Sequence, residues 1–397
     1  MNDRGGDPLI LVLNCGSSSI KFALFDADAM PLARAPAWSG KVEGITGDAP
    51  VFSESGAAAG TLTLDKHHPY HAALAHLRKR IVARLDGRRI VAIAHRVVHG
   101  GSKYLEPVRV DAAVLADLKS YIPLAPLHQP FALEAIAALL AELPHLPQVA
   151  CFDTAFHQSM PSVEKMLPLP RSAWNQGLRR YGFHGLSYAY QAQVLGERHG
   201  DAARGRTIVA HLGNGASLCA MRNLQSVATT MGFSALDGLM MGTRCGALDP
   251  GALIYLMEIR KLSLERVARM LYHESGLLGV SGVSPDLREL LPRENEQPVR
   301  EALALYVRSI VRELGALTAT LGGLDMLVFT AGIGEHQPVI RERVCAGLGF
   351  LGVAIDPDAN AAHAAVISST ASRVKVVVEA TNEEWVAATA AATLIHS

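Results

Sequence analysis

The chain has 397 residues, 49% of them hydrophobic and 19% charged, so it can bury a large core and is neither disordered nor charge-driven. Lysine plus arginine and aspartate plus glutamate both number 37, so no net charge attracts nucleic acid. No apolar run is long enough to span a membrane, and the first residues lack the apolar segment of a secretory signal. At about 150 residues per domain, we expect two domains in a cytoplasmic protein that binds neither nucleic acid nor membrane.

The cysteines are an odd number, lie far apart and form no CxxC motif. They are Cys15, Cys151, Cys219, Cys245 and Cys345. This pattern predicts buried free thiols in a reducing compartment, with a catalytic thiol as the alternative.

The first 150 residues read as a mixed α/β domain. Apolar runs at 9–13 and 20–25 flank a glycine- and serine-rich turn at 14–19, which predicts strand, turn, strand. Residues 30–66 have the composition of edge strands and loops. Further helices are predicted at 70–85, 111–119 and 131–142, and further strands at 90–94 and 148–152.

The second half of the chain repeats the strand, turn, strand pattern found at its start. A strand at 207–212, a turn at 213–217 and a strand at 218–221 follow each other about 200 residues later, which indicates a duplicated fold. We place the domain boundary near residue 150. The remaining predicted elements are a helix at 299–321, a strand at 326–330 that runs into a glycine-rich turn at 332–336, a helix after Pro338 and a helix from Glu383 to the end.

Three glycine-rich turns, at 14–19, 213–217 and 332–336, each follow an apolar strand. Glycine lets backbone N–H groups approach a phosphate, and serine or asparagine adds donors. None of the turns is a Walker A or GxGxxG sequence, and one alone would be an ordinary hairpin turn. Three together favour a nucleotide site at the strand ends. Lys21 either meets a phosphate there or is solvated.

His95, Arg96 and His99 lie in a segment that follows a strand and is predicted to be extended. Four residues of strand span about 13 Å, too far for one zinc ion to bind both histidines. Arg96 has small and apolar neighbours, and a buried arginine requires an anion. Asp153 ends a predicted strand, where it is either an active-site carboxylate or a helix N-cap.

His184 lies between two glycines and two aromatic residues, which suits either a ligand contact or a hydrogen-bonded core histidine. Arg244 lies at the centre of a loop in the second half. It either binds an anion or forms a salt bridge with Asp249.

Nine motifs, in order along nearly the whole chain, resemble the acetate kinase family of acylate kinases, within the superfamily of sugar kinases, Hsp70 and actin. They lie at 13–22, 95–101, 126–130, 152–157, 181–185, 211–215, 241–244, 330–335 and 381–384. The resemblance implies an α/β fold of two duplicated actin-like, ribonuclease H-like domains, with mixed sheets flanked by helices and an active-site cleft between them. The first domain would span 1–150, with the helix 383–397 packed back on it, and the nucleotide-binding domain 151–382.

The resemblance also implies reversible, direct in-line transfer of the γ-phosphoryl group of ATP to acetate, giving acetyl phosphate and ADP, by a homodimer that closes on its substrates. Mg²⁺, with Mn²⁺ as an alternative, would be held at Asn14 and Glu383. The catalytic residues would be Arg96, Asp153, His184 and Arg244, and the acyl substrate would contact Arg96, Val98, Leu127, His128 and Phe183. The ATP contacts would be Ser17, Ser19, Lys21, His211, Leu212, Gly213, Asn214, Gly215, Asp286, Leu287, Arg288, Gly332, Ile333, Gly334, Glu335 and His336.

These roles suit the chemistry. A phosphoryl group in transfer spreads negative charge over three oxygens, so positioned cations and donors stabilise it. We do not expect Asp153 to act as a general base, because a carboxylic acid with a pKa of about 4 is already ionised at neutral pH. Asp153 is expected to hold Arg96 or the magnesium shell.

The chain departs from the family pattern at two places. Ala235 stands where the family usually has a proline that helps to wall the acyl pocket, so we expect propionate to fit better here than in typical members. Ala380 stands where a proline often precedes the threonine, which leaves Glu383 and Glu384 as alternatives for the metal position. The competing functions are a propionate or other short-chain acylate kinase and, in another class, a nucleotide-gated binding protein of the Hsp70 or actin type.

Overall fold

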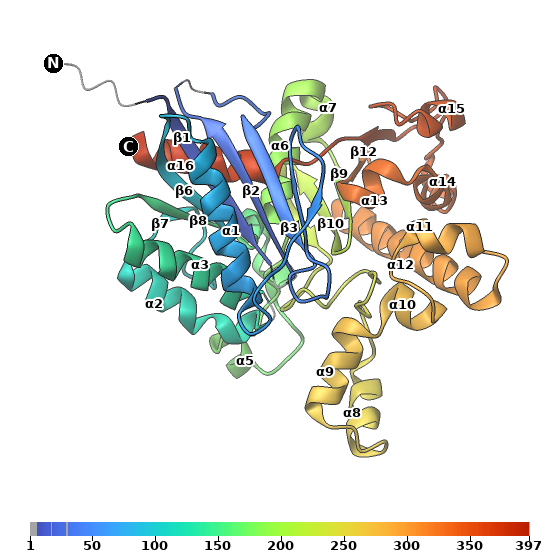
Figure 1. Cartoon of the computed structure of the whole chain (residues 1–397). Coiled ribbons are helices and arrows are strands. Elements are labelled where there is room, and N and C mark those ends of the chain that lie inside the picture. Colours follow the sequence, from blue (N-terminus) through green and yellow to red (C-terminus); the bar gives the residue numbers. More distant parts are fainter. Residues whose placement is uncertain (1–5, 17, 29–30, 127, 397) are drawn as a thin grey trace. The chain divides into compact units, whose positions relative to one another are not determined.

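The computed structural model describes residues 6–16, 18–28, 31–126 and 128–396. These residues fold into two compact units, which Figure 1 shows. The first unit contains the described chain up to Ala155 together with the segment from Asn382 onward, and the second contains Phe156–Thr381. No described helix has the length and apolar character needed to cross a bilayer.

An eight-stranded mixed sheet forms the centre of the first unit, in the order β5-β4-β3-β2-β1-β6-β8-β7. The strands are β1 (Pro8–Cys15), β2 (Ser19–Asp26), β3 (Trp38–Glu43), β4 (Val51–Glu54), β5 (Gly60–Thr61), β6 (Arg89–Val97), β7 (Val108–Arg109) and β8 (Gln148–Phe152). β1 is antiparallel to β2 and parallel to β6, and β6 is parallel to β8. The carboxyl ends of β1, β6 and β8 therefore meet at one edge of the sheet.

Helices pack on this sheet because its central strands are apolar on both faces, as in β1, where Leu9–Leu13 are all buried. α1 (Pro69–Arg84) and α3 (Gln129–Glu142) share a buried cluster with Leu9, Leu11 and Leu13 of β1. α16 (Glu383–His396) contacts β1, β6 and β8, and Figure 1 shows it behind the sheet, with α1 in front. The alanines Ala387 and Ala391 are fully buried, so α16 packs closely. α2 (Ala112–Ser120) packs against α3.

A five-stranded sheet forms the centre of the second unit, in the order β11-β10-β9-β12-β13. The strands are β9 (Thr207–Leu212), β10 (Ala216–Arg222), β11 (Gln225–Thr229), β12 (Met326–Thr330) and β13 (Lys375–Val378). The long helix α12 (Gln297–Leu321) packs on β9, β10 and β11. The other α-helices are α4 (Ser162–Lys165), α5 (Arg171–Asn175), α6 (Gly185–His199), α7 (Asp201–Arg204), α8 (Pro250–Glu258), α9 (Leu264–His273), α10 (Gly276–Ser281), α11 (Leu287–Leu290), α13 (Ala331–His336), α14 (Pro338–Ala346) and α15 (Pro357–Ala361). Short 3₁₀ turns occur at Ile122–Leu124, Ala155–Ser159, Leu291–Arg293 and Gly349–Leu351.

The two sheets repeat one arrangement of five strands. In each unit the hairpin's first strand (β1 or β9) is antiparallel to the second strand (β2 or β10) and parallel to the next strand of the sheet (β6 or β12). A third strand (β3 or β11) is antiparallel to the second strand of the hairpin. A fifth strand (β8 or β13) is parallel to β6 or β12. The duplicated α/β fold predicted from the sequence is confirmed.

The predicted elements are confirmed with one correction. The segment 332–336 was expected to be a glycine-rich turn, but it lies in helix α13, which begins directly after β12. Ala331 adopts a left-handed backbone with a φ of 64°, which turns the chain from strand to helix within one residue. The turn at 213–217 is shorter than expected, because β10 begins at Ala216.

Candidate functional site

Three polar side chains of the first unit lie at the carboxyl ends of neighbouring parallel strands. Asn14 is next to last in β1, Arg96 is next to last in β6, and Asp153 follows β8 directly. The strand register pairs Leu13 with His95 and Arg96 with Cys151, so these residues sit at adjacent positions along one sheet edge. Active sites of α/β proteins gather at such an edge.

Arg96 is held by carboxylates through all three of its nitrogens. Nε lies 2.8 Å from Oδ1 of Asp153, and Nη2 lies 2.7 Å from Oδ2. Nη1 lies 2.9 Å from Oε2 of Glu383, the first residue of α16. Asp153 is 2% exposed, and its carboxylate accepts two parallel hydrogen bonds from one guanidinium, so it is not used as a helix cap.

Negative charge exceeds positive charge around Glu383. Burial raises the pKa of Glu383 to about 7, with Asp153 and Glu384 adding to the rise and Arg96 and Lys21 opposing it. A divalent cation would relieve this excess, and carboxylate and amide oxygens such as those of Glu383 and Asn14 are ligands that Mg²⁺ accepts. These donor types suit magnesium, while the described residues contain no group of three or more histidine, cysteine, aspartate or glutamate side chains that could hold a metal ion.

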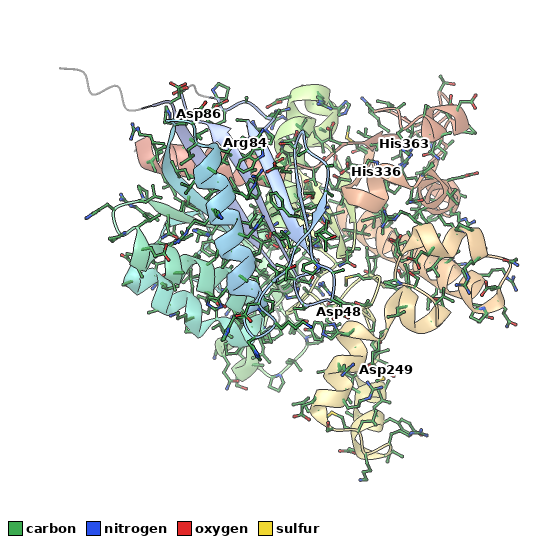
Figure 2. All side chains as sticks on the ribbon, in the orientation of Figure 1. Asp48, Arg84, Asp86, Asp249, His336 and His363 are labelled. Carbon is green, nitrogen blue, oxygen red and sulfur yellow. The ribbon has the colours of Figure 1, made fainter. Side chains whose placement is uncertain are left out.

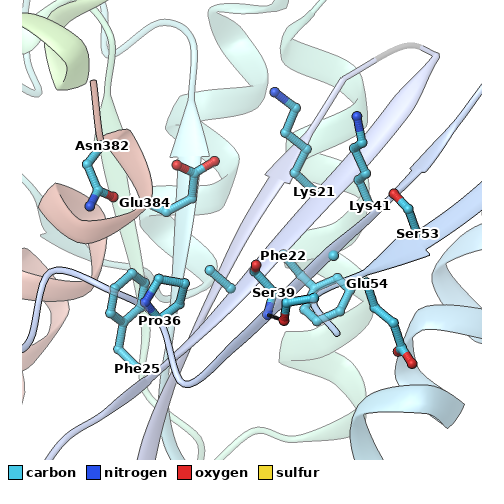
Figure 3. Close-up of a pocket in the computed structure, with 13 residues that line it drawn as sticks. Lys21, Phe22, Phe25, Pro36, Ser39, Lys41, Ser53, Glu54, Asn382 and Glu384 are labelled. Carbon is cyan, nitrogen blue, oxygen red and sulfur yellow. Dashed lines mark hydrogen bonds between the residues drawn. The ribbon is translucent and has the colours of Figure 1, made fainter. Parts of the chain in front are cut away.

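Lys21 lies opposite Asn14 in the β1–β2 register and is exposed. Figure 3 shows its side chain at a pocket of about 390 Å³, together with Lys41 of β3 and Glu384 of α16. Glu54, which also lines this pocket, is neutralised by Arg80 at 2.6 Å. Lys21 thus lies near the carboxylates that surround Arg96. Ser19 begins β2 and is half-buried.

Two predicted site residues, Ser17 and Leu127, lie outside the described residues. Of the other residues expected to contact the acyl substrate, Val98 is half-buried just after β6, and His128 immediately precedes α3.

The two histidines that flank Arg96 bind protein groups. The extended backbone predicted here is confirmed for His95, which lies in β6, and its Nε2 is 2.8 Å from Oε1 of Gln148. Nδ1 of His99 accepts a hydrogen bond of 2.8 Å from the backbone N–H of Gly101. Burial lowers the pKa of each histidine to about 4, so both are neutral at pH 7.

In the second unit, His184 is held in an unusual backbone conformation at the start of α6. Its φ is 59°, in the left-handed region that residues other than glycine rarely adopt. Its ring stacks on His211 of β9, with centroids 4.1 Å apart and planes 18° apart. Nδ1 lies 2.8 Å from Oγ of Ser217. The preceding residue, Phe183, is buried, and its carbonyl oxygen lies 2.9 Å from Nε2 of His157.

The glycine turn between β9 and β10 lies beside His184 and Arg244. A methyl group at Gly215 would lie 3.0 Å from Nε2 of His184 and 3.7 Å from Nη1 of Arg244. The turn is closed by a hydrogen bond of 3.1 Å from the N–H of Gly213 to the carbonyl oxygen of Gly215. The structure therefore brings together these three predicted site segments of the second unit.

Arg244 is positioned by the loop that contains Ala235. Its Nη1 lies 3.1 Å from the carbonyl oxygen of Ala235, and burial lowers the pKa of the guanidinium. The expected alternative partner, Asp249, caps α8 instead, with Oδ1 accepting a hydrogen bond of 2.8 Å from the N–H of Gly251. Figure 2 labels Asp249, the residue immediately before α8.

Two of the predicted ATP segments approach the same glycine turn. A methyl group at Gly213 would lie 3.6 Å from Cβ of Ala331, the first residue of α13. A methyl group at Gly242 would lie 3.3 Å from Oδ1 of Asn214 and 3.2 Å from Cβ of Pro285, the residue before Asp286. Ala331 thus lies beside Gly213, and Pro285 lies beside Gly242, which in turn approaches Asn214.

The individual residues of these segments differ in exposure. Asp286 caps α11 by accepting a hydrogen bond of 2.8 Å from the N–H of Arg288, whose side chain is exposed. Leu212, Leu287 and Gly334 are buried, Ile333 is half-buried, and Gly332 and His336 are exposed. Figure 2 shows His336 on α13. Oε1 of Glu335 accepts a hydrogen bond of 3.2 Å from the N–H of Thr381.

Residues that support the histidines were not predicted from the sequence. Ser217 binds His184, and Oγ of Ser187 lies 2.8 Å from Nδ1 of His211. The hydroxyl of Tyr188 lies 2.6 Å from Ser217. No sequence signal places these side chains, because His184 precedes α6 with a left-handed backbone and the helical spacing rule does not extend to it.

The cysteines are free thiols, as predicted. Burial raises the pKa of Cys15 to about 11 and that of Cys151, Cys219 and Cys345 to about 12, so these four are not activated as nucleophiles. Cys245 is partly exposed, and burial also raises its pKa.

The repeated five-strand sheets, each with an arginine near the carboxyl ends of its central strands, define a phosphotransferase of the actin-like fold. The sequence model of the Acetokinase family matches residues 9–389, and the chain belongs to this family.

Known relatives agree over nearly the whole chain. An acetate kinase of Rhodopseudomonas palustris is 49% identical over 382 residues, which cover 95% of this chain and 96% of the relative. The crystal structure of Porphyromonas gingivalis acetate kinase superposes with a TM-score of 0.86 at 36% identity, covering 98% of this chain and 100% of that chain. The crystal structure of a propionate kinase from Francisella tularensis also has a TM-score of 0.86 at 36% identity, covering 96% of this chain and 98% of that chain.

Proposed function

We propose that this chain is an ATP-dependent acetate kinase, which transfers the γ-phosphoryl group of ATP directly to acetate and also catalyses the reverse reaction. The proposal rests on the ion pairs of Arg96 with Asp153 and Glu383, in a chain that belongs to the Acetokinase family. A guanidinium fixed in this way is a rigid two-pronged donor for a carboxylate or a phosphoryl group.

The catalytic roles follow from the charge that develops during transfer. Arg96 binds the acyl carboxylate, and Arg244 and His184 stabilise the oxygens of the phosphoryl group. Asp153 orients Arg96 and does not remove a proton, because the carboxylate of acetate is already ionised at neutral pH. In this proposal Val98, His128 and Phe183 bind the acyl group.

ATP is bound by the glycine turn between β9 and β10 and by the two segments that approach this turn. Residues 211–215 approach the phosphates with backbone N–H groups, and 286–288 and 332–336 contact the rest of the nucleotide. In this proposal Ser19 and Lys21 supply further donors to the phosphates. Asn14 and Glu383 would hold Mg²⁺, or Mn²⁺, which neutralises phosphate charge when bound. Glu383 is preferred over Glu384 because Glu383 contacts Arg96 directly.

Trapping of the product tests this function. Purified protein with ATP, Mg²⁺ and acetate is incubated with hydroxylamine, which converts acyl phosphate to a coloured hydroxamate. Hydroxamate that depends on both ATP and acetate, and that is lost in Arg244→Ala, supports the kinase. ATP hydrolysis without hydroxamate would identify a nucleotide-gated binding protein instead.

Propionate is the second candidate substrate, favoured by Ala235, the residue whose carbonyl holds Arg244. One additional methylene in an apolar pocket changes kcat/KM by about 10–200-fold. Comparison of kcat/KM for acetate, propionate and butyrate decides between the two substrates, and a strong preference for acetate would exclude the propionate enzyme.

We also infer a homodimer in the cytoplasm. α8 has a largely apolar sequence but no buried side chain, and Ile254, Tyr255 and Ile259 are more than half exposed there. Exposed apolar patches of this kind mark interaction sites, and a second copy of the chain would cover this one. Light scattering of the wild type and of Ile254→Glu tests the assignment, because a dimer through α8 would dissociate in the variant. The free buried thiols suit a reducing compartment.

A further inference from the structure

Ser217 lies between two side chains at the start of α6. His184 immediately precedes the helix, and Tyr188 lies in its first turn. Oγ of Ser217 lies 2.8 Å from Nδ1 of His184 and 2.6 Å from the hydroxyl of Tyr188. Ser217 and Tyr188 are both fully buried, so neither hydroxyl is open to bulk water.

The directions of these two hydrogen bonds follow from a count of protons. Each hydroxyl has one proton to donate. Within the described part of the chain, Ser217 is the only hydrogen-bond partner of the Tyr188 hydroxyl. Burial raises the pKa of Tyr188 well above its usual value, so the phenol keeps its proton. A buried donor must be satisfied, so Tyr188 donates to Ser217, and Ser217 donates to Nδ1 of His184.

We infer that Tyr188 and Ser217 are positioning residues that hold His184 neutral, with its proton on Nε2. A proton on Nδ1 would disrupt the chain of hydrogen bonds, because Ser217 would then accept from His184 and would have no acceptor for its own proton other than the Tyr188 oxygen. Either the serine proton or, if Ser217 donated to Tyr188, the phenol proton would be left buried without an acceptor. Imidazolium, which has a proton on both nitrogens, is disfavoured for the same reason.

The Nε2 proton faces the glycine turn. Nε2 is the atom of His184 that a methyl group at Gly215 would approach most closely, at 3.0 Å, whereas Nδ1 is turned toward Ser217. This inference rests on the proposed function for its use: a neutral imidazole N–H donates to an oxygen of the phosphoryl group without adding a charge that must be balanced.

The surrounding groups favour a neutral ring. The titratable or charged groups that face the network are His157, His211, Cys219 and Arg244. The parallel stack of His184 on His211 places two imidazoles 4.1 Å apart, and Arg244 approaches the same glycine turn. A positive charge on His184 would be repelled by Arg244.

The substitution Tyr188→Phe tests the inference because it removes the hydroxyl and keeps the buried ring. Imidazole ¹⁵N and ¹³C NMR of histidine-labelled protein, with the His184 signals assigned by their loss in His184→Gln, reports the tautomer directly. In the wild type we expect one tautomer, with the proton on Nε2, between about pH 6 and pH 8. In Tyr188→Phe we expect a mixture of tautomers, a higher titration midpoint for His184 and a kcat about tenfold lower, with KM for acetate and ATP changed less than about twofold.

Tyr306→Phe is the matched control. Tyr306 is also buried, and its hydroxyl has no hydrogen-bond partner among the described residues, so its removal should leave the His184 signals and kcat unchanged. Ser217→Ala removes both hydrogen bonds of the serine hydroxyl and should shift the His184 tautomer as Tyr188→Phe does. A wild-type proton on Nδ1, or identical His184 tautomers and titration in the wild type and both variants, would overturn the inference. Because the NMR readout needs no turnover, an Nε2 tautomer in a protein that makes no acyl phosphate would contradict only the proposed function.

Discussion

Arg96 and Asp153 meet edge to edge, joined by two parallel hydrogen bonds of 2.8 and 2.7 Å. The pair connects two neighbouring parallel strands, because Arg96 lies in β6 and Asp153 follows β8. This contact gives Asp153 a function that requires no titration: its negative charge fixes the plane in which Arg96 presents its two remaining N–H donors. Removing one partner of a buried ion pair lowers the free energy of unfolding by about 3–5 kcal/mol. The orientation of the Arg96 guanidinium is therefore well determined.

Asp153→Asn should therefore lower kcat/KM for acetate at every pH. The amide nitrogen cannot accept the second N–H of Arg96, so the guanidinium is held by one bond where there were two. We expect a loss of about 100-fold or more, as for a small displacement of a group that positions substrate. The measurement is kcat/KM from pH 6 to pH 9. A loss confined to low pH, with full recovery as the pH rises, would contradict the orienting role and indicate titration.

Gly215→Ala should impair catalysis without unfolding the protein. The added methyl group would lie 3.0 Å from Nε2 of His184, tighter than ordinary van der Waals contact, so the imidazole must shift. We expect kcat to fall about tenfold or more. Gly315→Ala in α12 is the control, because nothing lies within 4 Å of its new methyl group and helical Gly→Ala changes stabilise by about 0.5–1 kcal/mol. Equal kcat values for Gly215→Ala and the wild type would show that the ring is not confined there.

Ala235→Val should shift the substrate preference toward acetate. A bulkier side chain at this position narrows the space available to a longer acyl chain, while the backbone carbonyl that holds Arg244 remains. The ratio of kcat/KM for propionate to that for acetate should fall about tenfold, within the range of about 1–3 kcal/mol per methylene. Ala247→Val, at an exposed position of a nearby loop, should leave the ratio unchanged. An unchanged ratio in Ala235→Val would remove this residue from the acyl pocket.

The stability of the first unit should depend on pH through its buried histidines. Burial lowers the pKa of His95 from 6.5 to about 4, so between these values the unfolded chain binds a proton that the folded chain does not. Neutral His95 contributes fully to the free energy of unfolding above pH 6.5. This contribution falls by about 3 kcal/mol as the pH decreases toward 4.

Denaturant unfolding at pH 7, 6 and 5 measures this dependence. His95→Gln keeps a polar group next to Gln148 but cannot titrate, so its stability should fall less steeply with acid than that of the wild type. His67→Gln, at an exposed position, serves as the control and should keep the wild-type slope. Equal slopes for the wild type and His95→Gln would contradict the prediction.

Most local structure could be predicted from the sequence, because strands and helices follow from the spacing of apolar residues. The hairpin at Pro8–Asp26 and the strand Met326–Thr330 were predicted with nearly correct limits. The helix at Ala331–His336 was not predicted, because its two glycines are typical of a turn. The left-handed backbone of Ala331, which starts the helix, cannot be inferred from the residue type.

The sequence by itself determined which residue types were available for chemistry: arginines among small neighbours, carboxylates at strand ends, and glycine turns after strands. Only the tertiary structure decided which of them meet. Arg96 binds Asp153, 57 residues away, because parallel strands β6 and β8 are neighbours in the sheet. His184 binds Ser217, 33 residues away, because α6 begins beside the β9–β10 hairpin. Such contacts depend on strand order and on the direction of buried side chains, which local spacing along the chain does not specify.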